Sequence, residues 1–317
     1  MKTRFQPGEQ LDHFLIHEVV STGATAVILR ATDLRTQRTV GIKIPRFEVE
    51  SEPLLAERFH REEEIGKTLH HPGIIKVYPE TERSQLYLVT EWFEGAPLRE
   101  LLQKGPLAKE RAVRIAIGVC NILGYLHDHG IVHRDLTPDH ILVGAEDVLR
   151  LTGFGVASMN GARRITFSSL SQMIGLTTYL SPEELSGKRG DARSDLYAVG
   201  VILYEMLTAK LPFRELNPYE ARLYPVPPRE ADPSITPQLQ EVIFRALEPE
   251  PRHRYGTAHE LARGLAHLDE VKIEERPELF GRDTLKERPK GKRALLIALV
   301  ALVPIILFIL LLVVARS

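Results

Sequence analysis

The sequence predicts an α+β protein in which strands precede helices, followed by a separate apolar helix. Residues 11–43 alternate between apolar and polar side chains with the period of two that is typical of β-strands. From Leu98 onward the apolar residues recur with the period of about 3.6 that indicates amphipathic helices. Residues 294–315 contain no charged side chain and have no polar face. A run of strands followed by a run of helices favours an α+β domain.

Length and composition limit the classes of function. A chain of 317 residues with 44% apolar residues can bury one large core or two smaller ones. The net charge of −1 implies no broad basic surface, so we expect no nucleic-acid partner. The single cysteine, Cys120, excludes an intramolecular disulfide, and its apolar surroundings favour a buried small residue over a reactive thiol. Residues 1–10 are polar and lack the apolar region of a signal peptide.

The expected elements lead to one polar loop. A strand pair with a turn at 21–26 is followed by a charged amphipathic helix over 52–70 and by strands over 74–78 and 86–90. A long apolar-faced helix over 110–129 then leads into residues 133–142, a polar turn between apolar residues. This turn presents Asp135, a candidate proton acceptor, beside Arg134. A short hairpin return ends in the Gly-Phe-Gly of residues 153–155.

These two segments resemble the catalytic loop and the metal-binding loop of the eukaryotic-type (Hanks-type) serine/threonine protein kinases, usually H-R-D-L-K-P-E-N and D-F-G. Asp135 matches the proton-accepting aspartate and Arg134 the arginine before it. Further motifs follow in the family's order from about Leu11 to Leu268, and residues 177–183 and 203–208 are most similar to bacterial members. The resemblance implies a bilobal protein-kinase fold over 11–268, with a small β-rich N-lobe and a larger helical C-lobe.

The resemblance also implies an ATP site. Gly23 alone remains of the three glycines of the phosphate-covering loop, so backbone approach to phosphates is restricted. Lys43 matches the lysine that reaches the α- and β-phosphates, and Glu62 matches the helix glutamate that pairs with it. Glu63 is the alternative, because three consecutive acids blur the register. The other positions that match ATP contacts of the family are Ile28, Glu91, Phe93, Glu94 and Leu142.

Several chemical groups of the family are replaced. Gly153 stands for the D-F-G aspartate and His140 for the asparagine, so both usual Mg²⁺ ligands are gone. Neutral imidazole is a poor ligand for a hard cation, so we expect poor Mg²⁺ binding and at most weak ATP binding. Thr137 replaces the lysine that would meet the γ-phosphate, and Leu176 replaces the threonine that would contact this lysine.

The architectural positions of the family are retained. Glu183 closes the loop in the manner of the A-P-E motif, and Arg254 matches its ion-pair partner. Asp195 matches a buried aspartate that anchors the catalytic loop. The polar segment after Gly155 and through Gly175 resembles an activation loop, and the hydroxyl residues assigned to this loop are Thr166, Ser168, Ser169, Ser171, Thr177 and Thr178.

The C-terminal part predicts a membrane anchor. Residues 269–293 form a hydrophilic linker that becomes basic, and residues 294–315 would span roughly 33 Å as a helix, against about 30 Å of hydrocarbon. The proline at 304 is tolerated in a spanning helix. The basic cluster before the span predicts that the folded domain faces the cytoplasm. Only Arg316 and Ser317 follow, so we expect a tail anchor without an extracellular sensor.

Retained architecture with replaced chemical groups predicts a membrane-anchored pseudokinase, a regulatory or scaffolding module with protein partners in signalling. The alternative is a slow or unconventional serine/threonine kinase that uses Asp135 as base and Lys43 for phosphate. Gly153 and His140 favour the first interpretation, whereas the retained Asp135 and Lys43 favour the second.

Overall fold

The structure, a computed structural model, describes residues 5–23, 25–46, 53–159, 176–213 and 225–274. Met1–Ile273 form one compact unit, and Glu274–Ser317 form a second. Apart from Glu274, the second unit lies outside the described residues, and so does the predicted span over 294–315. Among the residues that are described, no helix is long and apolar enough to cross a membrane.

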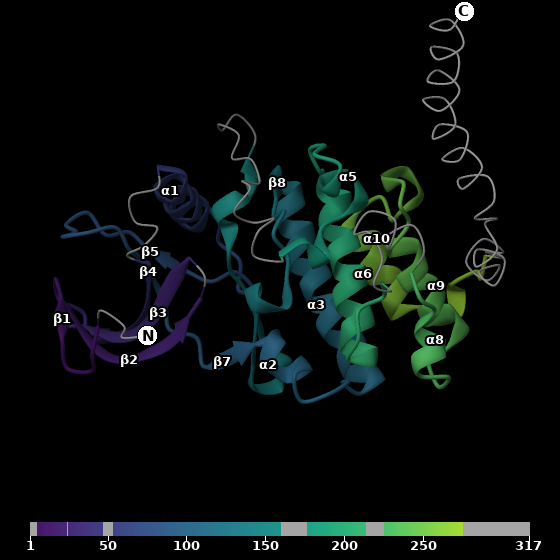
Figure 1. The fold of residues 1–317 in the computed structure, drawn as a ribbon, viewed down its shortest axis with the longest axis horizontal. Coiled ribbons are helices and arrows are strands. Elements are labelled where there is room, and N and C mark those ends of the chain that lie inside the picture. Colours follow the sequence, from purple (N-terminus) through teal and green to yellow (C-terminus); the bar gives the residue numbers. More distant parts are fainter. Residues whose placement is uncertain (1–4, 24, 47–52, 160–175, 214–224, 275–317) are drawn as a thin grey trace, which may run out of the picture. The chain divides into compact units, whose positions relative to one another are not determined.

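The small lobe is a six-stranded antiparallel sheet with the order β1-β2-β3-β4-β6-β5 (Figure 1). Alternate residues of β2 to β4 turn inward, because successive side chains of a strand point to opposite faces, and Ile16, Leu29 and Ile42 are fully buried. The strand predicted over 74–78 is shorter in the structure, and Ile74 instead forms an isolated bridge with Leu151. The strand bounds are β1 Gln10–Leu11, β2 Phe14–Thr22, β3 Ala26–Asp33, β4 Arg38–Pro45, β5 Val77–Tyr78 and β6 Leu88–Glu91.

Helix α1, Pro53–Thr68, carries one of the site residues and packs on the sheet. Its proline occupies the first turn, where the missing N–H has no intrahelical acceptor. Phe59 is buried against Leu88 and Val77, so the helix is fixed to β5 and β6. The boundaries agree with the charged amphipathic helix predicted over 52–70 to within two residues.

The large lobe is built around α3, Lys109–Asp128, and α6, Ala192–Thr208. Residues 194–207 of α6 are all buried, in agreement with the mostly apolar sequence of that helix. Asp191 caps it by accepting a hydrogen bond from the amide of Arg193. The remaining elements are α2 Leu98–Leu102, α5 Pro182–Leu185, α8 Pro228–Ala231, α9 Pro237–Ala246, α10 Ala258–Ala266 and the 3₁₀ turns Leu176–Tyr179, Pro251–His253 and Leu268–Glu270.

Short strands and 3₁₀ turns between α3 and α5 carry the predicted catalytic segments, and β7, which precedes α2, pairs with one of these strands. Strand β9 pairs with β7 and β10 in a three-stranded sheet, and β8 pairs with β11. The segment between α3 and α5 contains the hairpin return expected from the sequence. Its elements are β8 Ile131–Val132, β9 Ile141–Gly144, β10 Leu149–Leu151, β11 Ser158–Met159 and the 3₁₀ turns Pro138–His140, Ala145–Asp147 and Phe154–Val156, and β7 is Gly95–Pro97.

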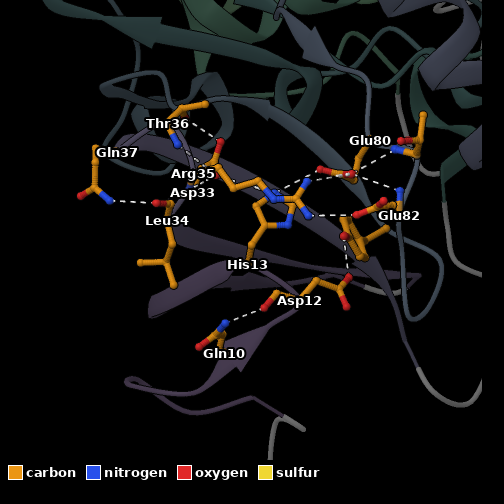
Figure 2. Close-up of polar contacts among 12 residues, drawn as sticks. Gln10, Asp12, His13, Asp33, Leu34, Arg35, Thr36, Gln37, Glu80 and Glu82 are labelled. Carbon is orange, nitrogen blue, oxygen red and sulfur yellow. Dashed lines mark hydrogen bonds and ion pairs between the residues drawn. The ribbon is translucent and has the colours of Figure 1, made fainter.

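A polar cluster ties two turns of the small lobe to the segment between β5 and β6 (Figure 2). The Nε2 atom of His13 lies 3.2 Å from Glu80 Oε2 and 3.7 Å from Asp33 Oδ1. Arg35 donates to Glu82 across the same gap, with 3.0 Å between Nη2 and Oε2. These contacts join residues that are far apart in sequence, and they fix this end of the sheet.

Candidate nucleotide and catalytic site

Lys43 and Glu62 form the ion pair at the centre of the small lobe's contribution to the site. Lys43 Nζ lies 2.6 Å from Glu62 Oε2, and the glutamate side chain is only 7% exposed. Because β3 pairs with β4, Ile28 lies directly opposite Lys43 in the sheet. The alternative register is wrong, since Glu63 contacts Lys67 and Arg83 instead. The pair holds the lysine ammonium beside α1.

Asp135 lies on a loop whose backbone is hydrogen-bonded to the buried Asp195. Asp195 accepts hydrogen bonds from the backbone amides of His133, at 2.9 Å, and Arg134, at 2.8 Å. His127 Nε2 lies 2.8 Å from the same carboxylate. Burial raises the pKa of Asp195, but the contact with His127 and the amide of Arg134 outweigh it, and the pKa is lowered. The anchoring contact expected for Asp195 is therefore present, and Arg134 adopts the left-handed backbone conformation with φ of 64°.

His140 turns back onto the loop that carries Asp135. Its Nδ1 lies 2.7 Å from the carbonyl oxygen of Asp135 and 3.8 Å from the Asp135 carboxylate. A carbonyl oxygen only accepts, so this hydrogen bond requires the hydrogen to be on Nδ1. The imidazole also lies against Gly153, where an added Cβ would come within 2.5 Å of His140 Cδ2. The imidazole thus fills the space that a side chain at position 153 would need.

Of the predicted hinge residues, Glu91 ends β6, and Phe93 and Glu94 lie between β6 and β7; their side chains are engaged with protein groups. Glu91 Oε1 accepts from Arg150 Nε at 3.0 Å, and the Arg150 guanidinium lies 4.9 Å from the ring centroid of Phe93. Glu94 Oε1 accepts from the indole of Trp92 at 2.7 Å. Leu142 is half-buried on β9 opposite Arg150. Gly23 lies in the exposed turn between β2 and β3, where its amide donates to Ala26.

The predicted pairing of Glu183 with Arg254 is present as a bidentate contact. Both guanidinium nitrogens, Nη1 and Nη2, lie 2.7 Å from the two carboxylate oxygens. The arginine side chain is 0% exposed and the glutamate side chain is 11% exposed. Ser194 donates to the same carboxylate at 2.8 Å. Burial raises the pKa of Glu183, but the contacts with Arg254 outweigh this effect, so the pKa lies below its ordinary value.

The sequence does not single out Arg58 of α1, because a charged residue on an amphipathic helix is normally expected to be exposed to solvent. Burial lowers the pKa of its guanidinium, and the negative charge of Asp135 offsets part of this effect. Arg58 is therefore within electrostatic reach of the candidate base. A Cβ on Gly155 would lie 3.3 Å from Arg58 Cβ, so the segment 153–155, which matches the family's metal-binding loop, packs directly on this part of α1.

The predicted activation-loop hydroxyls are largely outside the described residues. Thr166, Ser168, Ser169 and Ser171 lie there, and the side chain of Thr177 is also not described. Thr178 lies in the 3₁₀ turn Leu176–Tyr179 at the start of the segment that closes the loop.

Positions 153 and 140 do not provide the oxygen ligands with which the family binds Mg²⁺. Gly153 offers no oxygen, and a carboxylate there would collide with His140. His140 Nδ1 is committed to the carbonyl of Asp135, so the imidazole cannot present this nitrogen to a cation without breaking that contact. The residues do fit the phosphates of ATP at one point, Lys43, which is aligned by Glu62.

Comparison with known proteins gives the family. Residues 14–264 match the protein kinase domain family. The serine/threonine-protein kinase PknB of Mycolicibacterium smegmatis is 33% identical over 302 residues, covering 91% of this chain and 48% of that protein. PknB of Mycobacterium tuberculosis is 32% identical over 285 residues, covering 86% of this chain and 46% of that protein. The chain thus spans about half the length of the curated relatives it matches.

Solved structures agree on the fold. The crystal structure of the Mycobacterium tuberculosis PknI kinase domain matches with a TM-score of 0.66 at 20% identity, covering 83% of this chain and 99% of that one. The architecture is the bilobal protein-kinase fold, with a β-sheet N-lobe and a helical C-lobe. The chain belongs to the bacterial Hanks-type serine/threonine protein kinase family, and its relatives in that family are PknB-like.

Proposed function

We propose that this chain is a membrane-anchored pseudokinase that acts as a regulatory or scaffolding module in signalling. The observation that carries the proposal is the position of His140, whose imidazole occupies the space beside Gly153 where the family places a metal-binding carboxylate. Phosphoryl transfer depends on positioning and on charge neutralisation by the metal ions. Losing about 4 kcal/mol of transition-state stabilisation slows a reaction roughly a thousandfold.

A second candidate, a slow or unconventional serine/threonine kinase, is favoured by other observations. Lys43 and Glu62 are in contact, and Asp135 is held on an anchored loop. The relatives are serine/threonine kinases by name. In this alternative Asp135 accepts the proton of the substrate hydroxyl, and Lys43 binds phosphate.

Transfer of radiolabelled phosphate from ATP separates the two candidates. The full chain in detergent is compared with Asp135→Asn, both with magnesium and with a chelator, using autophosphorylation and a general protein substrate. The pseudokinase proposal expects equal, background incorporation in all arms. Magnesium-dependent incorporation that Asp135→Asn abolishes would overturn it in favour of the kinase alternative.

The membrane anchor is part of the same proposal, and its support is the uncharged run over 294–315 behind a basic cluster. Expressed in bacteria, the full chain should sediment with membranes and resist alkaline extraction. A chain that ends at Arg293 should be released as a folded, soluble protein, and protease added outside intact spheroplasts should leave the kinase-like domain of the full chain uncut. Retention of the truncated, non-aggregated chain in the membrane fraction would disprove the anchor.

A further inference from the structure

The carboxylate of Glu63, which follows Glu62 on α1, is held by two cations. Both terminal nitrogens of Arg83 donate to it: Nη1 lies 3.2 Å from Oε2, and Nη2 contacts Oε1. Lys67, one turn further along the helix, places its Nζ 2.8 Å from Oε1. Burial raises the pKa of Glu63, but the hydrogen bonds from Arg83 and Lys67 outweigh this effect, so its pKa lies below the ordinary value and the carboxylate is charged at neutral pH.

The two cations differ in burial and in the element that carries them. The side chain of Arg83 is 14% exposed and that of Glu63 is 10% exposed, whereas that of Lys67 is 42% exposed. Lys67 belongs to α1 itself, so its contact moves with the helix. Arg83 belongs to the segment between β5 and β6, so its contact joins α1 to another part of the small lobe. Of these two contacts, only that of Arg83 can fix α1 relative to the sheet.

The segment that carries Arg83 is itself attached to the sheet. The amide of Ser84 donates to Asp12 Oδ2 at 3.2 Å, and the hydroxyl of the buried Tyr87 donates to the same oxygen at 2.7 Å. The guanidinium carbon of Arg83 lies 5.6 Å from the ring centroid of Tyr87. Further ion pairs tie the same segment to two turns of the sheet (Figure 2). Arg83 is therefore presented to α1 from a fixed position.

Glu62 and Glu63 are successive residues, so their side chains leave α1 about 100° apart around its axis. Glu62 contacts Lys43 on β4, and Glu63 contacts Arg83. Contacts in two directions fix the rotation of a helix about its axis, which one contact cannot do. The packing of Phe59 on the sheet holds α1 against β5 and β6, but apolar attraction has no preferred direction. The rotation that brings Glu62 to Lys43 therefore depends on the second ion pair.

We propose that Arg83 is a positioning residue that holds α1 at the rotation in which Glu62 contacts Lys43. Without Arg83, the buried carboxylate of Glu63 keeps one cation, and it gains hydration by turning toward the solvent. The same rotation turns Glu62 away from Lys43. The lysine of the candidate nucleotide site is thus controlled from the segment between β5 and β6. The relevance of this control to nucleotide binding rests on the proposed function, in which Lys43 binds phosphate.

Carbodiimide cross-linking of the full chain in detergent measures this geometry without nucleotide. The reagent activates a carboxylate, which forms an amide with a lysine amine in contact with it, and mass spectrometry after digestion quantifies each linked peptide. The unmodified chain should give a first product, Lys43 joined to Glu62, and a second product, Lys67 joined to Glu63, because these amines lie 2.6 Å and 2.8 Å from their carboxylates. The second product reports a contact within α1 that rotation of the helix leaves intact, so it is the internal control.

Arg83→Gln should lower the yield of the first product roughly tenfold, which corresponds to about 1.4 kcal/mol in the equilibrium of helix rotation, and leave the second product unchanged. Arg83→Lys keeps the charge and should retain the first product. Arg245→Gln, which removes an ion pair with Glu260 in the large lobe, should leave both yields unchanged. A purely structural role for Arg83 would lower the melting temperature of Arg83→Gln without changing the yield of the first product.

Where Arg83→Gln does not fold, Glu63→Ala, which removes the acceptor of the same contact, takes its place and should lower the yield of the first product in the same way. The proposal is overturned if the variant that folds keeps the first product at the unmodified yield, or if the unmodified chain does not form this product. It is also overturned if neither variant folds, since the ion pair would then serve stability alone. Nucleotide and phosphate transfer do not enter this measurement, so its failure and that of the proposed function are distinguishable.

Discussion

The imidazole of His140 and the backbone of Gly153 are in such close contact that the two residues form one structural unit. A Cβ at position 153 would lie 2.5 Å from Cδ2, 2.6 Å from Cγ and 2.7 Å from Nε2 of His140. The backbone at Gly153 has φ of +86°, a conformation that favours glycine. The two departures from the family's metal site are thus coupled: a side chain at 153 requires a different rotamer or residue at 140.

We predict that Gly153→Asp alone destabilises the domain and that His140→Asn relieves much of this loss. The single substitution forces the imidazole out and strains the backbone, which costs on the order of 1–3 kcal/mol. Urea unfolding of both single variants and the double variant gives the coupling energy, expected at about 0.5–3 kcal/mol in favour of the double variant. Additive effects would contradict the steric coupling.

Glu183 and Arg254 supply a prediction about stability. Removing one partner of a buried, hydrogen-bonded ion pair leaves the other charge uncompensated, so Glu183→Ala should lower the free energy of unfolding by about 3–5 kcal/mol. The matched control is Glu82→Ala, which removes an ion pair with Arg35 whose side chains are 78% and 55% exposed. That change should cost at most about 1 kcal/mol. Equal shifts in the two thermal melts would argue against a buried role for Glu183.

Much of the fold could be predicted from the sequence because the signals are local. The change from the period of two to that of 3.6 separates the lobes. The contacts of Glu183 with Arg254 and of Asp195 with the loop of Asp135 are expected because these residues match motifs of the family that the sequence resembles. The contact of Arg99 Nη1 with Glu205 Oε1, at 2.8 Å, could not be predicted, since the two residues are 106 positions apart and nothing in the sequence pairs them. The steric relation between His140 and Gly153 likewise needs coordinates, because it depends on a backbone angle and a rotamer.

Glu184 predicts a pH dependence of stability. Burial, followed by the charges of Asp195 and Glu183, raises the pKa of Glu184 to about 7, although Ser181 donates to its Oε2 and opposes the shift. A carboxyl whose pKa is raised on folding binds a proton more tightly in the folded state. Its contribution to stability is therefore present at low pH and declines as the pH rises from its ordinary pKa of 4.5 to about 7.

Glu184→Gln keeps an oxygen that accepts from Ser181 but does not titrate. The melting temperature of the unmodified chain, relative to that of Glu184→Gln at the same pH, should therefore fall between about pH 4.5 and pH 7 and level off above. The comparison between the two proteins removes the contributions of Asp195 and Glu183, which have the opposite sign. A constant difference across this range would show that Glu184 titrates normally.

The last prediction concerns the effect of magnesium on nucleotide binding. With Gly153 and His140 in place, affinity for ATP must come from Lys43 and contacts of the adenine and ribose, so magnesium should add little. A ligand at about 100 times its Kd stabilises the native state by about 2.7 kcal/mol, which a thermal shift detects. We expect either no shift with ATP or a small shift that is equal in magnesium and in chelator, and Lys43→Met should abolish it. The variant Thr137→Lys/His140→Asn/Gly153→Asp restores the family's groups together with the space for them, so its shift should become larger in magnesium than in chelator. An unmodified chain whose shift requires magnesium would mean that other residues complete a metal site.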